Sequence, residues 1–293
     1  MAVATVVSKL RQQFILPSIS PLLGTTDNQF GFKASHGTDQ CTFLFKQTAS
    51  YFVTHGSSAH CAFSDALKAF DRVLRMKLFE KLIQRKVPMC FVRLLEQWCK
   101  EQTMQIQLGN HLYEPFHVTN GVRQGGVLSS YLFAVYLDDI STELNNIKPG
   151  YYIGEVLLNN LMFADDLCVF CPSVRGLQRI LDVCQAYAES HGIIVNCSKT
   201  VCMTLKAKCA KSTVTPLLTL ACQTVKPVNH YKYLGVLLDN ELSDNWHSET
   251  TAIPILCSKQ AANLFPNVQV QLKMYFFAVK NTFSGWGVSS HCF

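Results

Sequence analysis

The chain has few charged side chains and no long apolar run. Asp, Glu, Lys and Arg make up only 16% of its 293 residues, so a charged residue inside an apolar stretch requires an explanation. No apolar run approaches the roughly 18 residues that a membrane-spanning helix needs, and we expect no membrane partner. Internal repeats, low-complexity tracts and long charge blocks are also absent. These absences argue against a repeat protein and a disordered chain.

A secretory signal is also missing, because no charged segment is followed by an apolar core and a small-residue cleavage site. The 13 cysteines are scattered rather than spaced as a framework. Together these features indicate a reducing intracellular compartment. The one Cys-x-x-Cys, Cys168 to Cys171, is interpreted as buried strand thiols with one at the strand end, in preference to a zinc or redox site.

The composition that remains is that of a globular protein, with 48% hydrophobic residues. The length allows one large domain or two ordinary ones. The net charge of +6 and the pI near 8.6 suit a nucleic-acid partner. Many metabolic enzymes share such a mild basic excess, so charge supports a nucleic-acid partner without establishing one.

Apolar periodicity predicts an alternation of helices and strands, which is typical of an α+β domain. Helices are expected over 76–84, after Pro88, from Gly125-Gly126 to Ile140 with Ser129 or Ser130 near the cap, and from Ser173 to His191-Gly192. Strands are expected at 61–64, 161–170, 193–196 and 233–238, with a two-strand unit over 104–118 turning near Gly109-Asn110. Beyond about Asn240 the pattern loosens, and 284–293 looks unstructured.

Two adjacent carboxylates interrupt the apolar stretch from Leu161 to Phe170, at Asp165 and Asp166. Burying such a pair is costly, so it forms either an exposed hairpin turn or a site neutralised by a cation. Asp65 ends another predicted strand. If that strand pairs with the 161–170 hairpin, three carboxylates meet at one point, where they can bind two magnesium ions.

A second tetrad of the same kind, Tyr136-Leu137-Asp138-Asp139, lies on the helix predicted after Gly126. No apolar strand follows it. We interpret Asp138 and Asp139 as a solvated helix end and exclude them from the site.

Six blocks of the chain resemble the motifs of reverse transcriptases of LINE-type, non-LTR retrotransposons, in the family's order and over roughly residues 20 to 240. They are Gln29–Lys33 (fingers), Phe63–Asp71 (motif A), Gly121–Ser129 (motif B), Phe163–Asp166 (motif C), Asn196–Thr200 (motif D) and Tyr233–Gly235 (primer grip). The resemblance implies a right-hand polymerase fold with fingers and palm. The palm would be an antiparallel sheet with helices on one face, and the thumb would be truncated.

The resemblance also implies domain boundaries. A reverse transcriptase domain would cover 1–242, with part of the fingers in about 1–60 and the palm, including a fingers insertion, in 61–240. Residues 243–293 would be an incomplete thumb or tail.

The same resemblance assigns roles to individual residues. Asp65, Asp165 and Asp166 would bind the metals, and Ala66 would lend a backbone carbonyl. Phe70 would exclude a 2′-hydroxyl from the sugar site, the alternative being a core aromatic beside Ala69. The remaining assignments are Arg123, Gln124 and Gly125 beside nucleotide and template, Lys33 on the triphosphate and Lys199 as the acid for pyrophosphate. For each lysine, a solvated surface charge is the alternative.

The implied reaction is attack of a DNA primer's 3′-hydroxyl on a bound dNTP, directed by template RNA, with two Mg²⁺ ions or with Mn²⁺ in their place. The template would be held mainly through its phosphates and 2′-hydroxyls. The family also suggests an intracellular protein that acts in the nucleus. It indicates no particular protein partner.

The chain departs from the family pattern at Leu67, where Ser is usual, and at Ser130, where Pro is usual. It also begins inside the fingers and stops before a full thumb. A second hypothesis is therefore a non-catalytic or domesticated fragment that binds nucleic acid or a partner protein. A third, a magnesium enzyme unrelated to polymerases, would need another account of 121–129.

Overall fold

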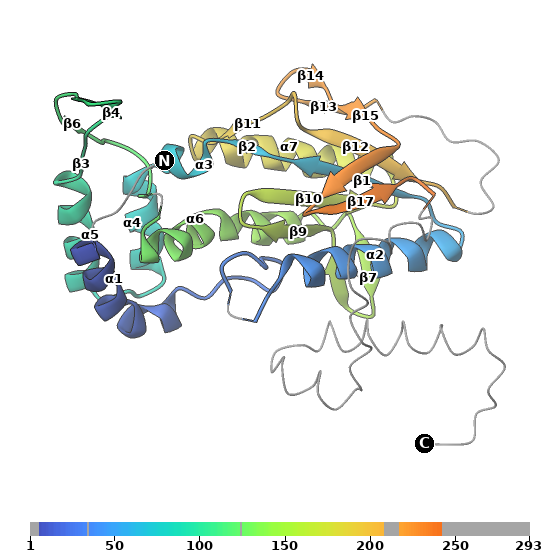
Figure 1. Ribbon diagram of the computed structural model, residues 1–293. Coiled ribbons are helices and arrows are strands. Elements are labelled where there is room, and N and C mark those ends of the chain that lie inside the picture. Colours follow the sequence, from blue (N-terminus) through green and yellow to red (C-terminus); the bar gives the residue numbers. More distant parts are fainter. Residues whose placement is uncertain (1–5, 34, 124, 208–216, 242–293) are drawn as a thin grey trace.

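A five-stranded sheet runs through the centre of the computed structural model (Figure 1). The structure describes residues 6–33, 35–123, 125–207 and 217–241. The predicted thumb or tail (243–293) and Gln124 lie outside these residues. The mixture of helices and strands confirms the predicted α+β class.

The sheet has the order β15-β12-β1-β10-β9. Its strands are β1 (Ala59–Ser64), β9 (Asn160–Phe163), β10 (Asp166–Cys171), β12 (Val201–Leu205) and β15 (Lys226–Pro227). Neighbouring strands are antiparallel except β12 and β15, which are parallel. The prediction of an antiparallel sheet thus holds for four strands, and the short parallel edge was not foreseen.

Helices cover both faces of this sheet, so the expectation of helices on one face alone is wrong. On one face lie α6 (Val127–Asn146) and α7 (Val174–Ser190), backed by α4 (Arg75–Gln84) and α5 (Met89–Lys100). On the other face α2 (Thr38–Thr54) packs against β1 and β10. The physical reason is that β1 is buried along five of its six residues, and a strand buried on both sides needs cover on both.

The two N-terminal helices, α1 (Val6–Ile19) and α2, were missed. The buried positions of α2 include Thr42 and Thr48, which interrupt the apolar stripe in the sequence. Within the helix, each of these hydroxyls donates to a carbonyl one turn earlier, Thr48 Oγ1 to the Leu44 oxygen at 2.7 Å. Such back-bonding satisfies a polar group that the sequence pattern counts against a helix.

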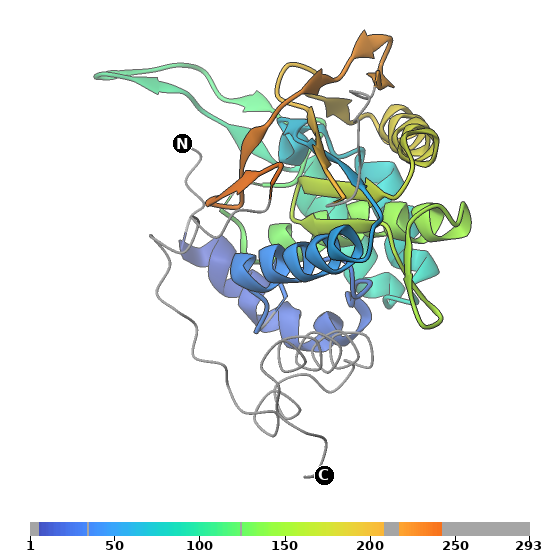
Figure 2. The same ribbon diagram turned by 90° about the vertical axis from the view of Figure 1, so that its right-hand side faces the viewer.

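Other predicted elements are confirmed. Helices α4 and α5 match the expected ranges, and Ser173 caps α7 by accepting from the Gly176 amide at 3.0 Å. The unit at 104–118 is a narrow arm of β3 (Thr103–Met104), β4 (Gln107–Leu108), β5 (His111–Leu112) and β6 (Phe116–His117). This arm projects away from the body of the molecule (Figure 2).

Helix α6 and the strand expected at 233–238 differ from prediction. Helix α6 begins at Val127, where neither Ser129 nor Ser130 caps it; instead the Gln12 side chain accepts from the Leu128 amide at 3.1 Å. The strand expected at 233–238 is a hairpin of β16 (His230–Tyr233) and β17 (Val236–Asp239). The chain reverses between them because Leu234 and Gly235 both have positive φ.

Short elements make up the rest of the secondary structure in the described residues. They are η1 (Ser20–Leu22), β2 (Ala66–Leu67), α3 (Ala69–Arg72), β7 (Tyr151–Ile153), β8 (Val156–Leu158), β11 (Ile194–Val195), β13 (Thr219–Leu220) and β14 (Gln223–Thr224). Among the helices that the structure describes, none is long and apolar enough to cross a membrane.

Candidate active site

Strand pairing brings Asp65 beside the Asp165-Asp166 turn. In the register of β1 and β10, Ser64 lies opposite Leu167, so Asp65 follows directly at the end of β1 where β10 begins. Phe163 pairs with Asp166, which leaves Ala164 and Asp165 as a two-residue turn between β9 and β10. The predicted pairing of the Asp65 strand with the hairpin is therefore confirmed.

The charges of the three carboxylates act on one another. Burial, together with the neighbouring charges of Asp165 and Asp65, raises the pKa of Asp166 to about 6. Burial also raises the pKa of Asp165, and Asp65 adds to that rise. Lys199 opposes both shifts. Like charges held together at a partly buried strand end favour a nearby cation.

Lys199 is the cation that the structure supplies at this point. Its ammonium lies 3.1 Å from Oδ2 of Asp65, and its side chain is 68% exposed. The loop that carries it is tied to the site, because the Asn196 amide donates to the Asp65 carbonyl at 2.9 Å. Strand β11 just before it pairs with β2, placing Val195 opposite Ala66.

Metal binding at these carboxylates stays a prediction. Carboxylate oxygens are the ligands that Mg²⁺ prefers, and the three residues lie on adjoining strand ends, so the donor chemistry fits. As placed, however, no group of three or more His, Cys, Asp or Glu side chains in the described ranges converges to hold an ion. Asp65 is paired with Lys199 instead.

Phe70 lies just beyond β2, between two other aromatic rings. It stacks on the buried Phe133 of α6, with ring centroids 4.1 Å apart, and meets Phe32 edge-on at 6.1 Å. The ring is half-buried rather than enclosed. This placement accommodates both the predicted gate and its alternative, a core aromatic.

The loop before α6 is bonded to the Phe70 segment. Gly121 has φ +84°, and a Cβ there would lie 2.8 Å from the Asp71 Cα, so only glycine fits. The Val122 amide donates to the Phe70 carbonyl at 2.9 Å. Arg123 reaches towards α1, its Nη1 lying 3.4 Å from Ser8 Oγ, and Gly125 has φ +79°.

Lys33 faces its own loop. Its ammonium donates to the Thr26 carbonyl, and burial lowers its pKa while Asp27 and Asp138 oppose that shift. The same loop brings Gln29, to which the sequence assigned no role, against the turn that carries Asp165 and Asp166. A single buried glutamine has no periodicity that could have indicated this contact.

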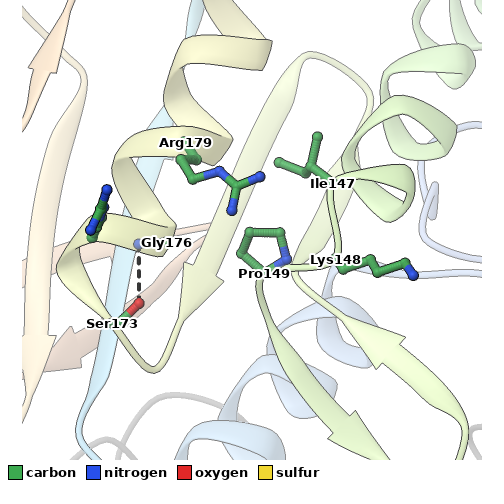
Figure 3. Close-up of a pocket in the computed structure, with 7 residues that line it drawn as sticks. Ile147, Lys148, Pro149, Ser173, Gly176 and Arg179 are labelled. Atoms are coloured by element: carbon green, nitrogen blue, oxygen red, sulfur yellow. Dashed lines mark hydrogen bonds between the residues drawn. The ribbon is translucent and has the colours of Figure 1, made fainter.

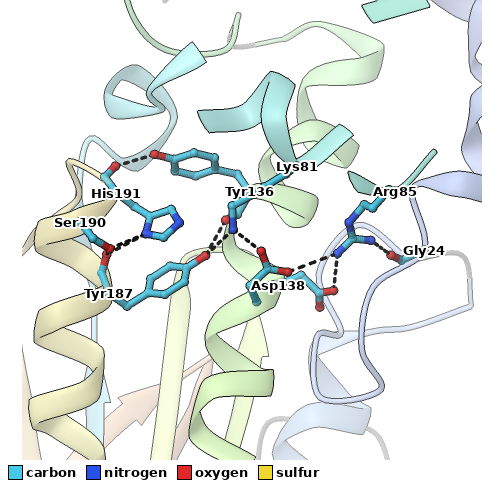
Figure 4. A network of polar contacts seen from close by, with 9 residues as sticks. Gly24, Lys81, Arg85, Tyr136, Asp138, Tyr187, Ser190 and His191 are labelled. Atoms are coloured by element: carbon cyan, nitrogen blue, oxygen red, sulfur yellow. Dashed lines mark hydrogen bonds and ion pairs between the residues drawn. The ribbon is translucent and has the colours of Figure 1, made fainter. Parts of the chain in front are cut away.

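Neither Asp138 nor Asp139 ends the helix and Asp138 is not solvated, so the interpretation as a solvated helix end is wrong; only the Asp139 side chain is partly exposed, at 43%. Helix α6 continues to Asn146, and Asp138 is only 4% exposed. Its carboxylate accepts from Arg85 Nη2 at 2.7 Å (Figure 4). It also accepts from the Thr26 amide at 2.7 Å. Asp139 pairs with Lys81. Both remain outside the site, as structural ion pairs of α6 with Lys81 of α4 and with Arg85, the residue that follows α4.

The two thiols of the Cys-x-x-Cys are buried and free in β10, with Cys171 at its end, as interpreted. Three residues apart on a strand, they face opposite sides of the sheet. Beyond Cys171, at the end of β10 away from the carboxylates, lies a pocket of about 620 Å³ lined by Pro149, Gly176 and Arg179 among others (Figure 3). It contains none of the predicted site residues.

A family model described as reverse transcriptase (RNA-dependent DNA polymerase) matches residues 1–238. The chain belongs to the reverse transcriptase family. The chain is related to non-LTR retrotransposon polymerases. It is 28% identical over 225 residues to the RNA-directed DNA polymerase from mobile element jockey of Drosophila melanogaster, covering 75% of this chain and 24% of that protein.

A second relative, the probable RNA-directed DNA polymerase from transposon X-element of Drosophila melanogaster, is 29% identical over 256 residues, covering 82% of this chain and 26% of that protein. The chain thus spans about a quarter of the length of these relatives. Its fold is similar to that of Candida tropicalis telomerase in a complex with a TWJ fragment of telomeric RNA, with a TM-score of 0.57 and 14% identity over 96% of this chain and 47% of that one.

Proposed function

We propose that this chain is an RNA-directed DNA polymerase domain that transfers nucleotides to a primer 3′-hydroxyl, as part of a non-LTR retrotransposon product. The observation that carries the proposal is the placement of Asp65, at the end of β1, beside the turn that bears Asp165 and Asp166. Homology to non-LTR retrotransposon polymerases supports it.

Two Mg²⁺ ions, or Mn²⁺, held by these three carboxylates would activate the attacking hydroxyl and stabilise the leaving oxygen. The raised pKa values of Asp165 and Asp166 support cation binding, because a divalent charge would relieve their mutual repulsion. The carbonyl of Ala66, next to Asp65, would complete the site from β2.

The other residues would bind and orient the substrates. Lys199, already near the carboxylates, would give a proton to the departing pyrophosphate. Phe70 would select deoxynucleotides by its ring. Lys33 would contact the triphosphate after leaving the Thr26 carbonyl, and the 123–125 loop, Gln124 included, would lie along nucleotide and template.

We propose the right-hand arrangement for the domain as well. Residues 1–60 would form part of the fingers and 61–240 the palm with a fingers insertion, while 243–293 would belong to an incomplete thumb or tail. The similarity to telomerase supports such a fold. Template RNA, DNA primer and dNTPs would be the partners, inside the cell and, by family, in the nucleus.

The test is magnesium-dependent extension of a DNA primer on an RNA template by the chain as given. We expect extension by the wild type and loss of it in Asp165→Ala. Equal extension by both would contradict the catalytic assignment. A folded wild type that binds RNA without extending a primer would favour the second hypothesis, a non-catalytic fragment.

A further inference from the structure

The turn that carries the two aspartates has a strained backbone. Ala164, its first residue, has φ +59°, a left-handed conformation that an L-residue with a Cβ adopts only with a conformational penalty. The next two residues are Asp165 and Asp166. Any relaxation at Ala164 would therefore move both carboxylates, so a contact that holds the Ala164 backbone, in addition to the pairing of β9 with β10, also holds them.

Gln29 is the neighbour that contacts Ala164 on both of its backbone polar groups. Oε1 of Gln29 accepts from the Ala164 amide at 3.1 Å, and its Nε2 lies 3.4 Å from the Ala164 carbonyl. The same Oε1 accepts from the Gly31 amide at 2.8 Å, which fixes the side chain itself. Gln29 is 0% exposed, so water does not compete for these bonds.

The segment around Gln29 is anchored to the same hairpin through its backbone. The Phe30 amide donates to the Met162 carbonyl, and the Met162 amide donates to the Asn28 carbonyl, both at 2.8 Å. Gln29 thus runs beside Met162 as a parallel bridge at the edge of β9. The clamp is therefore attached to the strand that leads into the turn.

Gly31 lets the two segments approach closely enough for this contact. A Cβ on Gly31 would lie 2.2 Å from the Ala164 nitrogen and 2.8 Å from its Cα. Both are backbone atoms, which cannot swing aside as the end of a flexible side chain can. Close approach, a buried amide and a strained turn occur together at one point of the fold.

We propose that Gln29 is a positioning residue, which holds Ala164 in its left-handed conformation and thereby fixes Asp165 and Asp166 for the metal-dependent reaction. The inference rests on the proposed polymerase function. Gln29 touches neither substrate nor metal in this role, and acts only through the turn. Lys33, in the same sequence block, is not needed for it.

The decisive variant is Gln29→Met, which has a similar shape and cannot form the amide bonds. Its matched control is Asn159→Leu, near the other end of β9. Asn159 is likewise 0% exposed, and its amide donates to the carbonyls of Leu144 and Pro149 at 2.8 and 3.0 Å. Each variant removes one buried side-chain amide at the sheet edge, but only the Gln29 amide contacts the turn.

Two readouts separate positioning from general stability. The first is hydrogen–deuterium exchange of the Ala164 amide, which we expect to be faster in Gln29→Met and unchanged in Asn159→Leu. The second is steady-state extension, where we expect kcat in Gln29→Met to fall by roughly 100-fold while the KM for dNTP changes little, since misplacement of about 1 Å has costs of that order. Asn159→Leu should keep the wild-type kcat per folded molecule.

Gly31→Ala provides a second variant in case Gln29→Met does not fold. It leaves Gln29 in place and pushes a methyl group against Ala164, so kcat should fall there as well. Unchanged exchange at Ala164 in Gln29→Met, or a kcat loss no greater than in Asn159→Leu, would overturn the positioning role of Gln29 and leave the proposed function standing. A folded but inactive wild type would instead overturn the proposed function on which it rests.

Discussion

The ammonium group of Lys199 lies 3.1 Å from the Asp65 carboxylate, although the two residues are far apart in the chain. The lysine side chain is 68% exposed and the aspartate side chain 24%. An ion pair this exposed adds little to stability. If Lys199 has the proposed role beside the carboxylates, its removal should therefore affect catalysis rather than stability.

Lys199→Ala should consequently leave the free energy of unfolding within about 1 kcal/mol of the wild type. Primer extension should slow by roughly 10²- to 10⁴-fold if Lys199 donates a proton to pyrophosphate. An unchanged extension rate would show that Lys199 is only a surface charge.

Phe70→Ala should admit ribonucleotides, because the ring proposed to clash with a 2′-hydroxyl would be gone. The measurement is the ratio of kcat/KM for a dNTP to that for the matching rNTP. Phe70→Tyr, which keeps the ring, is the control and should retain selection. If Phe70→Ala lowers the unfolding midpoint with the ratio unchanged, Phe70 serves only to pack against Phe133.

Asp166 should make stability depend on pH in the absence of metal. Its pKa is raised to about 6 in the folded chain, above its ordinary value of 3.8, so the folded state binds the proton more tightly than the unfolded state. Stability from this group is present below pH 3.8 and is lost as pH rises through 6. In a chelator, Asp166→Asn should therefore melt higher than wild type above pH 6, and this gain should shrink towards pH 4. A gain that is the same at pH 4 and pH 7 would contradict the raised pKa.

The two Asp-Asp pairs should respond to mutation in opposite ways. Asp138→Ala removes the acceptor for Arg85 and for the Thr26 amide, and should lower the free energy of unfolding by about 2–4 kcal/mol. The loss is smaller than for a fully buried pair because water reaches part of the Arg85 guanidinium. Extension per folded molecule should persist. Asp165→Asn should abolish extension without lowering the unfolding midpoint, because burial and Asp65 disfavour the Asp165 charge. Denaturant unfolding and extension assays on both variants check this.

The local elements of this fold could be predicted from the sequence, because their signals are local. The apolar spacing of α4 and α5, the Ser173 cap and the strand–turn–strand pattern around Asp165 are all carried by residues next to one another. Once Asp65 was assigned to the end of a strand, pairing of that strand with the hairpin predicted that Asp65 lies beside Asp165 and Asp166.

What the sequence did not predict depends on distant partners. Asp138 became a buried ion pair because Arg85 and Thr26 come from other parts of the chain. Helix α2 could not be seen because its buried threonines bond within the helix. Gln29 gained a place at the turn only through Ala164, 135 residues later.

The central position of β1 has a consequence for how the molecule is made. Its two neighbours, β10 and β12, are both synthesised about a hundred residues or more after it. Asp65 is therefore synthesised well before the strand that brings its partners. A chain interrupted before residue 166 cannot bring the three carboxylates together. Such non-local pairing slows folding. Interrupted products should lack the site altogether rather than carry a weakened one.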